Sequence, residues 1–421
     1  MSLKVDKDLR KPLVTAFFLR ILGAVAYSML VQYYYGYGDA FTFYEGGKFI
    51  SDQISSDLSK IRYLFAPMSE VGDWYNAESG RSSMSGYFSH ASGNMVMKIS
   101  ALISFVAFDK FLIISMFFGY FSFLGQWKLF TVFDDINKKR NRRLLAMAIL
   151  YTPSIWFWGS GLLKDSICLG ALGFIIYYLY KFFVWRKFNL LEFMLLIVFA
   201  YVLTVIKSYI TIIFLIGLGI MAFLKFLVTI KNLILRAIVL LLTIGMVGLM
   251  IYSSDFSKTI DEMAEESIEQ IQSFQENYRT LQESEENSRA GFNLGEFELT
   301  FTNLILKSPS VIFTTLFRPF IWESRKIIIV FTSLESLLLL LVTLYVMFRM
   351  GMSNFFRAIS RTPFLLFCFS VSMLFALIIG FTTFNFGTMI RYKIILLPFY
   401  YFMLTNLYTM YIDRKKVPAI R

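Results

Sequence analysis

The sequence predicts an all-α polytopic membrane protein. Of the 421 residues, 57% are hydrophobic and only 17% are charged, whereas soluble domains carry about 25% charged residues. Apolar stretches of about 20 residues recur, and each is long enough to cross a hydrocarbon core of roughly 30 Å. The short connections between these stretches are alternately basic and not basic. We therefore predict about ten transmembrane helices, at residues 13–35, 111–131, 144–161, 166–184, 189–206, 209–228, 234–253, 326–348, 363–383 and 392–411.

The distribution of positive charge predicts the orientation. Lysine and arginine clusters precede the first span and follow every second span, as in "KKRNRR" at 138–143. Because cytoplasmic loops carry the excess of Lys and Arg, both termini are predicted to be cytoplasmic. Orientation also accounts for the net charge of +12, so we do not expect a nucleic-acid partner.

One apolar segment does not fit this count as a span. Residues 95–108 read "MVMKISALISFVAF", and a span there would place the basic 138–143 cluster outside. The segment is also short, which suits a re-entrant or interfacial helix better than a crossing helix. We place it on the outer membrane surface.

Two long outer loops interrupt the predicted single integral membrane domain, residues 1–421. The first, 36–110, is rich in Ser, Gly, Asp and aromatic residues and is expected to hold short surface helices. The second, 254–325, begins with an acidic stretch in which apolar residues recur at three- to four-residue steps. This spacing predicts an amphipathic helix.

Ionisable residues gather at the predicted outer ends of the spans, where the positive-inside rule disfavours basic groups and therefore does not explain them. Four basic residues could together hold a phosphate or diphosphate; they are Arg391, Arg318, Lys164 and Lys207. Asp39 and Glu45 follow the first span and are candidate catalytic carboxylates, since a carboxylate can take a proton from an attacking hydroxyl. His90, Asp165 and Glu323 are candidate positioning residues.

Simpler roles remain open for several of these residues. Asp39 could cap a helix that begins near Ala40. Lys164 and Asp165 could neutralise each other at a helix start, and Arg391 could anchor a helix at the interface. The sequence has no recognised metal motif, and a requirement for a divalent metal is left open.

The layout resembles the C-fold (GT-C) membrane glycosyltransferases, particularly bacterial relatives of the dolichyl-phosphate-mannose protein mannosyltransferase family. The resemblance rests on "GDAFTFY" at 38–44 after the first span, and on "TPSIWFWGSGLLKDS" at 152–166 after a basic inner connection. It implies a bacterial inner-membrane enzyme with Asp39 as base and a polyprenyl-linked sugar as donor on the outer face. The acceptor would be a lipid, a protein or a glycan, and displacement by an activated hydroxyl would invert the anomeric centre.

Two alternatives stay open. The C-terminal "RYKIILLPFYYF" at 391–402 is similar to the ends of O-antigen and exopolysaccharide polymerases. A non-catalytic transporter or secretion-complex subunit is a different class of protein. That interpretation would begin from polar residues inside the spans, namely Arg20, Gln126 and Glu335.

Overall fold

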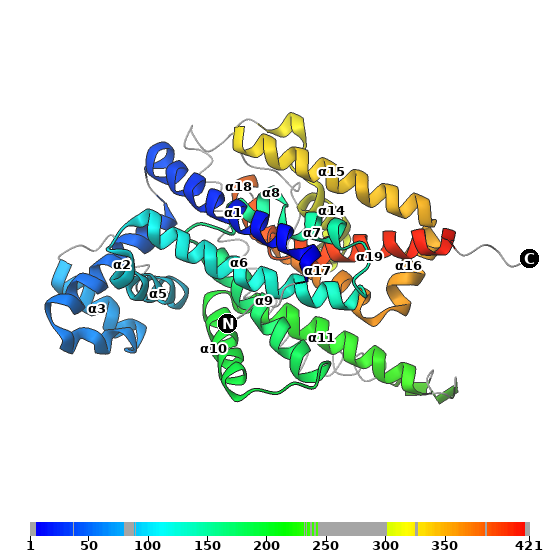
Figure 1. The fold of residues 1–421 in the computed structure, drawn as a ribbon, viewed down its shortest axis with the longest axis horizontal. Coiled ribbons are helices and arrows are strands. Elements are labelled where there is room, and N and C mark those ends of the chain that lie inside the picture. The colour runs from blue at the N-terminus through cyan, green and yellow to red at the C-terminus, as the bar shows by residue number, and fades with distance from the viewer. Residues whose placement is uncertain are drawn as a thin grey trace, which may run out of the picture. The chain divides into compact units, whose positions relative to one another are not determined.

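The computed structural model describes residues 6–36, 38–79, 88, 90–230, 232, 234–235, 238–239, 241–242, 301–324, 327–383 and 385–416. The regular elements in these residues are helices (Figure 1). The chain forms two compact units, Met1–Ile212 and Ile213–Arg421. That both belong to one membrane domain stays a prediction.

The first unit is built around four long helices. They are α1 (Lys7–Met29), which continues as a π-helix over Leu30–Tyr35, α6 (Phe111–Ile136), α9 (Lys164–Phe183) and α10 (Leu190–Ile206). Helix α6 packs against both α1 and α9, and α9 packs in turn against α10 (Figure 1). Glycines bring α6 and α9 into backbone contact, because a Cβ added at Gly125 would overlap the carbonyl of Gly170. Small residues permit this kind of close helix pairing in membranes.

The predicted span 144–161 is divided between two short helices, α7 (Arg142–Leu150) and α8 (Pro153–Trp158). Pro153 explains the break, because proline has no N–H to donate and disfavours helical geometry in the residue before it. Thr152 accordingly has an extended ψ of 121°. The carbonyls of Ile155 and Gly159 then accept hydrogen bonds from Arg20 of α1.

The first predicted outer loop contains the expected helices. These are α2 (Asp39–Ser56), a 3₁₀-helix over Leu58–Leu64, α3 (Met68–Ser79) and α5 (Ala91–Ala107). Helices α2 and α5 pack together, and α5 is turned by 114° from α6 at the break between them. This bend fits the re-entrant or interfacial segment predicted at 95–108, although its depth in the membrane stays a prediction.

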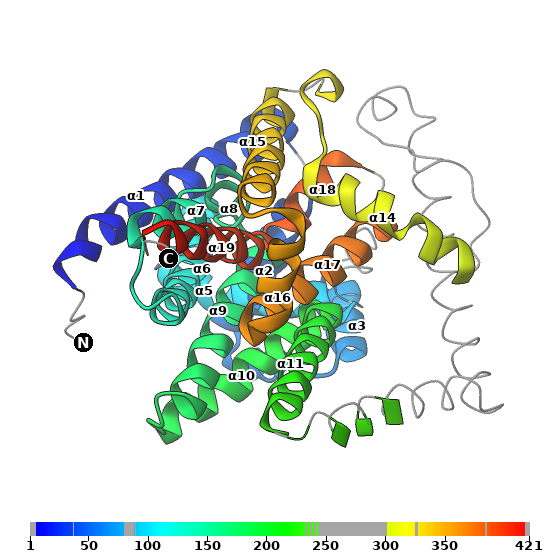
Figure 2. The ribbon, with the colours of Figure 1, turned by 90° about the vertical axis from the view of Figure 1, so that its right-hand side faces the viewer.

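The second unit contains α14 (Phe301–Phe317), α15 (Ile327–Met350), α16 (Met352–Arg361), α17 (Pro363–Thr382), α18 (Phe386–Lys393) and α19 (Leu397–Lys416). Most of α11 (Ser208–Thr229) also belongs to it. Helices α14 and α18 both pack on α17 (Figure 2).

Helix α14 lies within the predicted second outer loop, 254–325. The sequence predicts no helix at 301–317, yet these residues form one, and its buried face packs on α17. Thr315 donates a hydrogen bond to the carbonyl of Ala376, and a Cβ added at Gly380 would overlap Val311. Interspersed polar residues and Pro309 hide this helix in the sequence. The acidic amphipathic stretch of the same loop, and most of the predicted span 234–253, lie outside the described residues.

The described helices confirm a membrane-embedded α-helical protein. Five are long and apolar enough to cross a bilayer, namely Lys7–Tyr35, Lys164–Phe183, Ser208–Leu227, Ile329–Met350 and Pro363–Thr382. Two bent pairs, Ala91–Ala107 with Phe111–Ile136 and Phe386–Lys393 with Leu397–Asp413, raise the number to as many as seven. The finer prediction of ten spans is not confirmed.

Candidate functional site

A buried ion pair lies where α9 begins in the first unit. Asp165 is in the first turn of α9, and Lys207 occupies the single position between α10 and α11. The Lys207 Nζ lies 2.5 Å from Asp165 Oδ1, and the two residues are only 8% and 1% exposed. Charges this deeply buried are tolerated when they are paired. Two predicted site residues, 42 positions apart, are therefore brought together.

Lys164 connects the start of α9 to two helices of the first loop, α2 and α5. Its Nζ donates a 2.8 Å hydrogen bond to Ser92 of α5. The same ammonium lies 5.6 Å from the ring centre of Phe43, a buried residue of α2. We call Ser92, Lys164, Asp165 and Lys207 the α9 polar cluster. Ser92 was missed by the sequence analysis because an isolated loop serine carries no signal of its own.

Asp39 occupies the first position of α2, and its side chain is half-buried. Phe43 follows one helical turn later, so Asp39 shares the face of α2 that meets Lys164. The N-cap position belongs to Gly38, whose φ of 122° favours glycine. Asp39 is therefore placed in the first turn, where the helix dipole favours an acid, rather than at the cap itself.

Glu45 and His90 are both exposed. Glu45 lies six residues after Asp39, which places it on a different side of α2. His90 is the N-cap residue of α5, and its backbone carbonyl accepts the N–H of Asn94. It precedes Ser92 by two residues, so it is close in sequence to the α9 polar cluster.

The remaining predicted residues lie in the second unit. Glu323 accepts two bonds from Arg318 Nε, at 3.0 and 3.1 Å, a further bond from Arg318 Nη2, and the N–H of Phe320 at 2.8 Å. Burial alone would raise the pKa of Glu323, but these hydrogen bonds outweigh it and hold that pKa below its usual value. Arg391 is on α18, with its guanidinium 5.3 Å from the Tyr392 ring.

Lys393 ties α18 to the Arg318 turn. It is almost fully buried, and it donates hydrogen bonds to the carbonyl of Arg318 at 3.2 Å and to Ser336 Oγ at 2.9 Å. The Arg318 turn and α15, through Ser336, are thus connected to the helix that carries Arg391. Because this cluster and the α9 polar cluster belong to different units, a cavity shared by both stays a prediction.

The polar residues inside α1 and α6 are engaged with each other. Arg20 donates from Nη1 to Ser122 at 3.1 Å and to the Gly159 carbonyl at 2.8 Å, and from Nη2 to Gln126. Gln126 in turn donates to the Ile149 carbonyl. A transporter interpretation would begin from Arg20 and Gln126. Both side chains, however, donate hydrogen bonds to backbone carbonyls near the break between α7 and α8, as polar side chains do where a helix is interrupted in a membrane.

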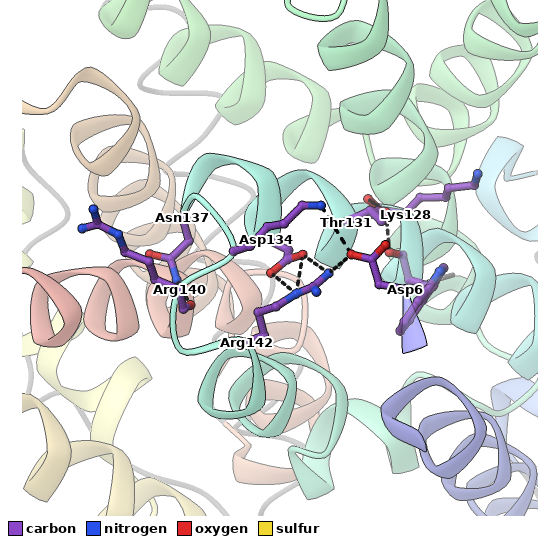
Figure 3. Close-up of polar contacts among 9 residues, drawn as sticks. Asp6, Lys128, Thr131, Asp134, Asn137, Arg140 and Arg142 are labelled. Carbon is purple, nitrogen blue, oxygen red and sulfur yellow. Dashed lines mark hydrogen bonds and ion pairs between the residues drawn. The ribbon is translucent and has the colours of Figure 1, made fainter. Parts of the chain in front are cut away.

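A network of ion pairs lies at the C-terminal end of α6. Arg142 donates to both carboxylate oxygens of the buried Asp134 at 2.8–3.0 Å and also to Asp6 at 2.9 Å (Figure 3). Lys139 lies 3.4 Å from the same Asp6 carboxylate. Hydrogen bonds from Arg142 and Lys139 hold the pKa of Asp6 below its usual value. The basic 138–143 cluster therefore has a structural role beside its predicted role in orientation.

No family model matches the chain, and no curated protein or solved structure matches it. Within the part of the chain that the structure describes, no group of three or more His, Cys, Asp and Glu residues is arranged to hold a metal ion.

Proposed function

We propose that the protein is a membrane glycosyltransferase. It would use a polyprenyl-phosphate- or diphosphate-linked sugar donor on the outer face of the inner membrane. The observation that carries the proposal is the position of Lys164. Its ammonium lies where α2, α5 and α9 meet, against the same face of α2 that carries Asp39. The Asp39 carboxylate and the Lys164 ammonium therefore lie at the same face of α2.

The chemistry assigns a separate role to each group. Lys164 would attract the donor phosphate and stabilise the charge that develops as the phosphate leaves. Asp165 and Lys207, which are buried and paired, would fix the first turn of α9 and so the position of Lys164. Asp39 would take the proton of the acceptor hydroxyl. Attack on the anomeric carbon by that hydroxyl would invert its configuration.

An apolar pocket of about 370 Å³ supports a lipid-borne donor. It is lined by side chains of α5, α6, α9 and α10, such as Ile99, Phe121, Ile167 and Phe199. Ile167 follows Asp165 by only two residues, so the pocket begins close to the α9 polar cluster. An isoprenoid chain needs this kind of apolar surface beside the site that holds its phosphate.

The second unit contains two of the predicted phosphate-binding residues, Arg318 and Arg391. Arg318 is already engaged by Glu323 in a bidentate pair, so Arg391 is the better candidate for a phosphate contact from this unit. Glu323 would then act by holding Arg318 and the turn that follows α14.

The test compares Asp39→Asn with Asp39→Ala in proteoliposomes that contain a panel of C55 polyprenyl-phosphate sugars. Sugar transfer is followed by chromatography of the lipid fraction. Loss of a general base typically lowers the rate by about 10²–10⁴-fold, so both variants should lose activity on that scale while still binding the donor. Lys164→Gln should instead weaken donor binding. Glu70→Gln, an exposed acid on α3, is the matched control and should keep full activity.

Two outcomes would contradict the proposal. If Asp39→Asn is active and Asp39→Ala is not, Asp39 only supports the start of α2, since an amide oxygen can still accept hydrogen bonds there but cannot take a proton. If the wild-type protein consumes none of the lipid-linked sugars, the result would favour a non-catalytic transporter or secretion-complex subunit.

A further inference from the structure

A second pocket, of about 630 Å³, lies on the opposite side of α2 from Asp39. From α2 it is lined by Phe41, Tyr44, Lys48 and Asp52. These residues recur at three- to four-residue steps and so form one helical face. The rest of its wall comes from Gln32 at the end of the first span and from residues 108–112, where α5 turns into α6. The volume is within the range of small-molecule sites.

Charges of both signs line this pocket. Lys48, Asp52 and Lys110 are exposed, and Asp109 is half-buried. Among the described residues, no side chain forms an ion pair with any of these four charged groups. Two ammonium groups and two carboxylates therefore face one space without neutralising each other. A ligand with one anionic and one cationic group would find partners for both.

The backbone of the α5–α6 turn is strained at the pocket wall. Phe108 and Asp109 both have a φ of 51°, a conformation that residues with a side chain rarely adopt. Tyr44 stabilises the turn by donating to the Asp109 carbonyl at 2.8 Å, and Ser51 donates to its Oδ1 at 3.0 Å. Strain of this kind persists where the surroundings enforce it, often at ligand sites.

Exposed apolar and tyrosine side chains near the pocket are typical of the membrane interface. Tyr33 and Tyr34, at the end of the first span, are 78% and 65% exposed, and Phe108 is 79% exposed. Tyrosines concentrate at the boundary between hydrocarbon and water. The neighbouring Val106 and Leu112 are exposed apolar residues of the kind that contact lipid chains. These side chains favour a pocket at the depth where a phospholipid presents its headgroup.

We propose that this pocket binds the headgroup of a zwitterionic phospholipid with a primary ammonium, of the phosphatidylethanolamine class. Lys48 and Lys110 bind the phosphate, while Asp52 and Asp109 accept hydrogen bonds from the ammonium. A choline headgroup has no N–H to donate to these carboxylates. A glycerol headgroup has no ammonium group. Asp52 and Asp109 would then face the anionic lipid phosphate without a cationic group of the lipid between them. The site is separate from Asp39, so it does not depend on the proposed transfer reaction.

The experiment measures lipid retention by native mass spectrometry. Delipidated full-length protein is mixed with equimolar dioleoyl phosphatidylethanolamine, phosphatidylcholine and phosphatidylglycerol in detergent. Phosphatidylethanolamine should be retained roughly tenfold over phosphatidylcholine, the factor expected when about one charge-assisted contact is lost. Equal retention of these two lipids would overturn the proposal.

Variants test the two halves of the pocket separately. Lys48→Gln combined with Lys110→Gln should reduce retention of all three lipids. Asp52→Asn should reduce the preference for ethanolamine over choline, because only Asp109 then remains as a carboxylate acceptor, and Asp52→Lys should favour phosphatidylglycerol. Lys11→Gln, an exposed lysine near the start of α1, is the control and should leave retention unchanged. Unaltered selectivity in Asp52→Asn would exclude the assigned ammonium contact.

Two competitors identify the source of the headgroup. Free phosphoethanolamine should displace the lipid only at much higher concentration, because the acyl chains add contacts. Tighter binding of the free compound would assign the pocket to a soluble ligand. Displacement of phosphatidylethanolamine by a polyprenyl-phosphate sugar would assign it to a substrate, and either result would overturn the proposal.

Discussion

Arg20, Asp165 and Lys207 are buried charges of the first unit, and their partners differ in kind. Arg20 donates to hydroxyl, amide and backbone carbonyl oxygens, whereas Asp165 and Lys207 satisfy each other. Burying a charge costs several kcal/mol, which good geometry can offset. We therefore expect substitutions of these three residues to be strongly destabilising.

Asp165→Asn should destabilise the first unit because it leaves Lys207 buried without its counter-charge. Breaking such a pair typically costs about 3–5 kcal/mol, and thermal unfolding in detergent would detect it. The double variant Asp165→Leu/Lys207→Met should recover most of the stability, since well-packed apolar residues can replace a buried pair. If the double variant also keeps full transfer activity, the pair serves the fold alone and has no part in catalysis.

Glu323 should stabilise the second unit at neutral pH and lose that effect only in acid. Its pKa is lowered in the folded state, so its contribution is fully present above the usual glutamate pKa of about 4.3 and falls as the pH drops through the folded value. The difference in melting temperature between wild type and Glu323→Gln should be constant from pH 8 to pH 6. It should shrink only below the usual glutamate pKa. A difference that vanishes near neutral pH would be inconsistent with the lowered pKa.

At the scale of helices, the sequence predicted those helices that depend on local composition alone. Helices α6, α9 and α17 are long apolar runs, and they form close to the predicted residues. Helix α14 was missed because its apolar face is visible only once α17 covers it. The contact between Asp165 and Lys207 was also hidden, although both residues were candidates, because their approach depends on how α9 and α10 pack.

Gly125→Ala should weaken the pairing of α6 and α9, because the added methyl group would overlap the Gly170 backbone. Overpacking of this kind typically costs about 1–3 kcal/mol. Gly219→Ala is the matched control, since its Cβ would meet nothing within 4 Å and alanine favours helix. Fluorescence-detected size-exclusion after heating should show an earlier loss of the monodisperse peak for Gly125→Ala alone. Equal behaviour of the two variants would mean that this close approach does not limit stability.

For the whole molecule, the main prediction is the orientation in the membrane. It rests on basic clusters counted along the chain, and Arg142 shows that such residues also hold the fold together through Asp134 and Asp6 (Figure 3). The two explanations are compatible, because ion-paired arginines at a helix end still resist transfer across a bilayer. An independent measurement of sidedness is nevertheless the firmest test.

Cysteine labelling in intact cells provides that measurement. The native Cys168 and Cys368 are buried, so a membrane-impermeant maleimide should report only on introduced thiols. Ser69→Cys on α3 and Ser360→Cys on α16 both replace exposed residues. The alternating basic connections place the first outside and the second in the cytoplasm, so Ser69→Cys should react directly and Ser360→Cys only after permeabilisation. The reverse pattern would place the α9 polar cluster on the cytoplasmic side. A polyprenyl-linked donor on the outer face would then be out of reach, whereas the headgroup pocket could still bind lipid of the inner leaflet.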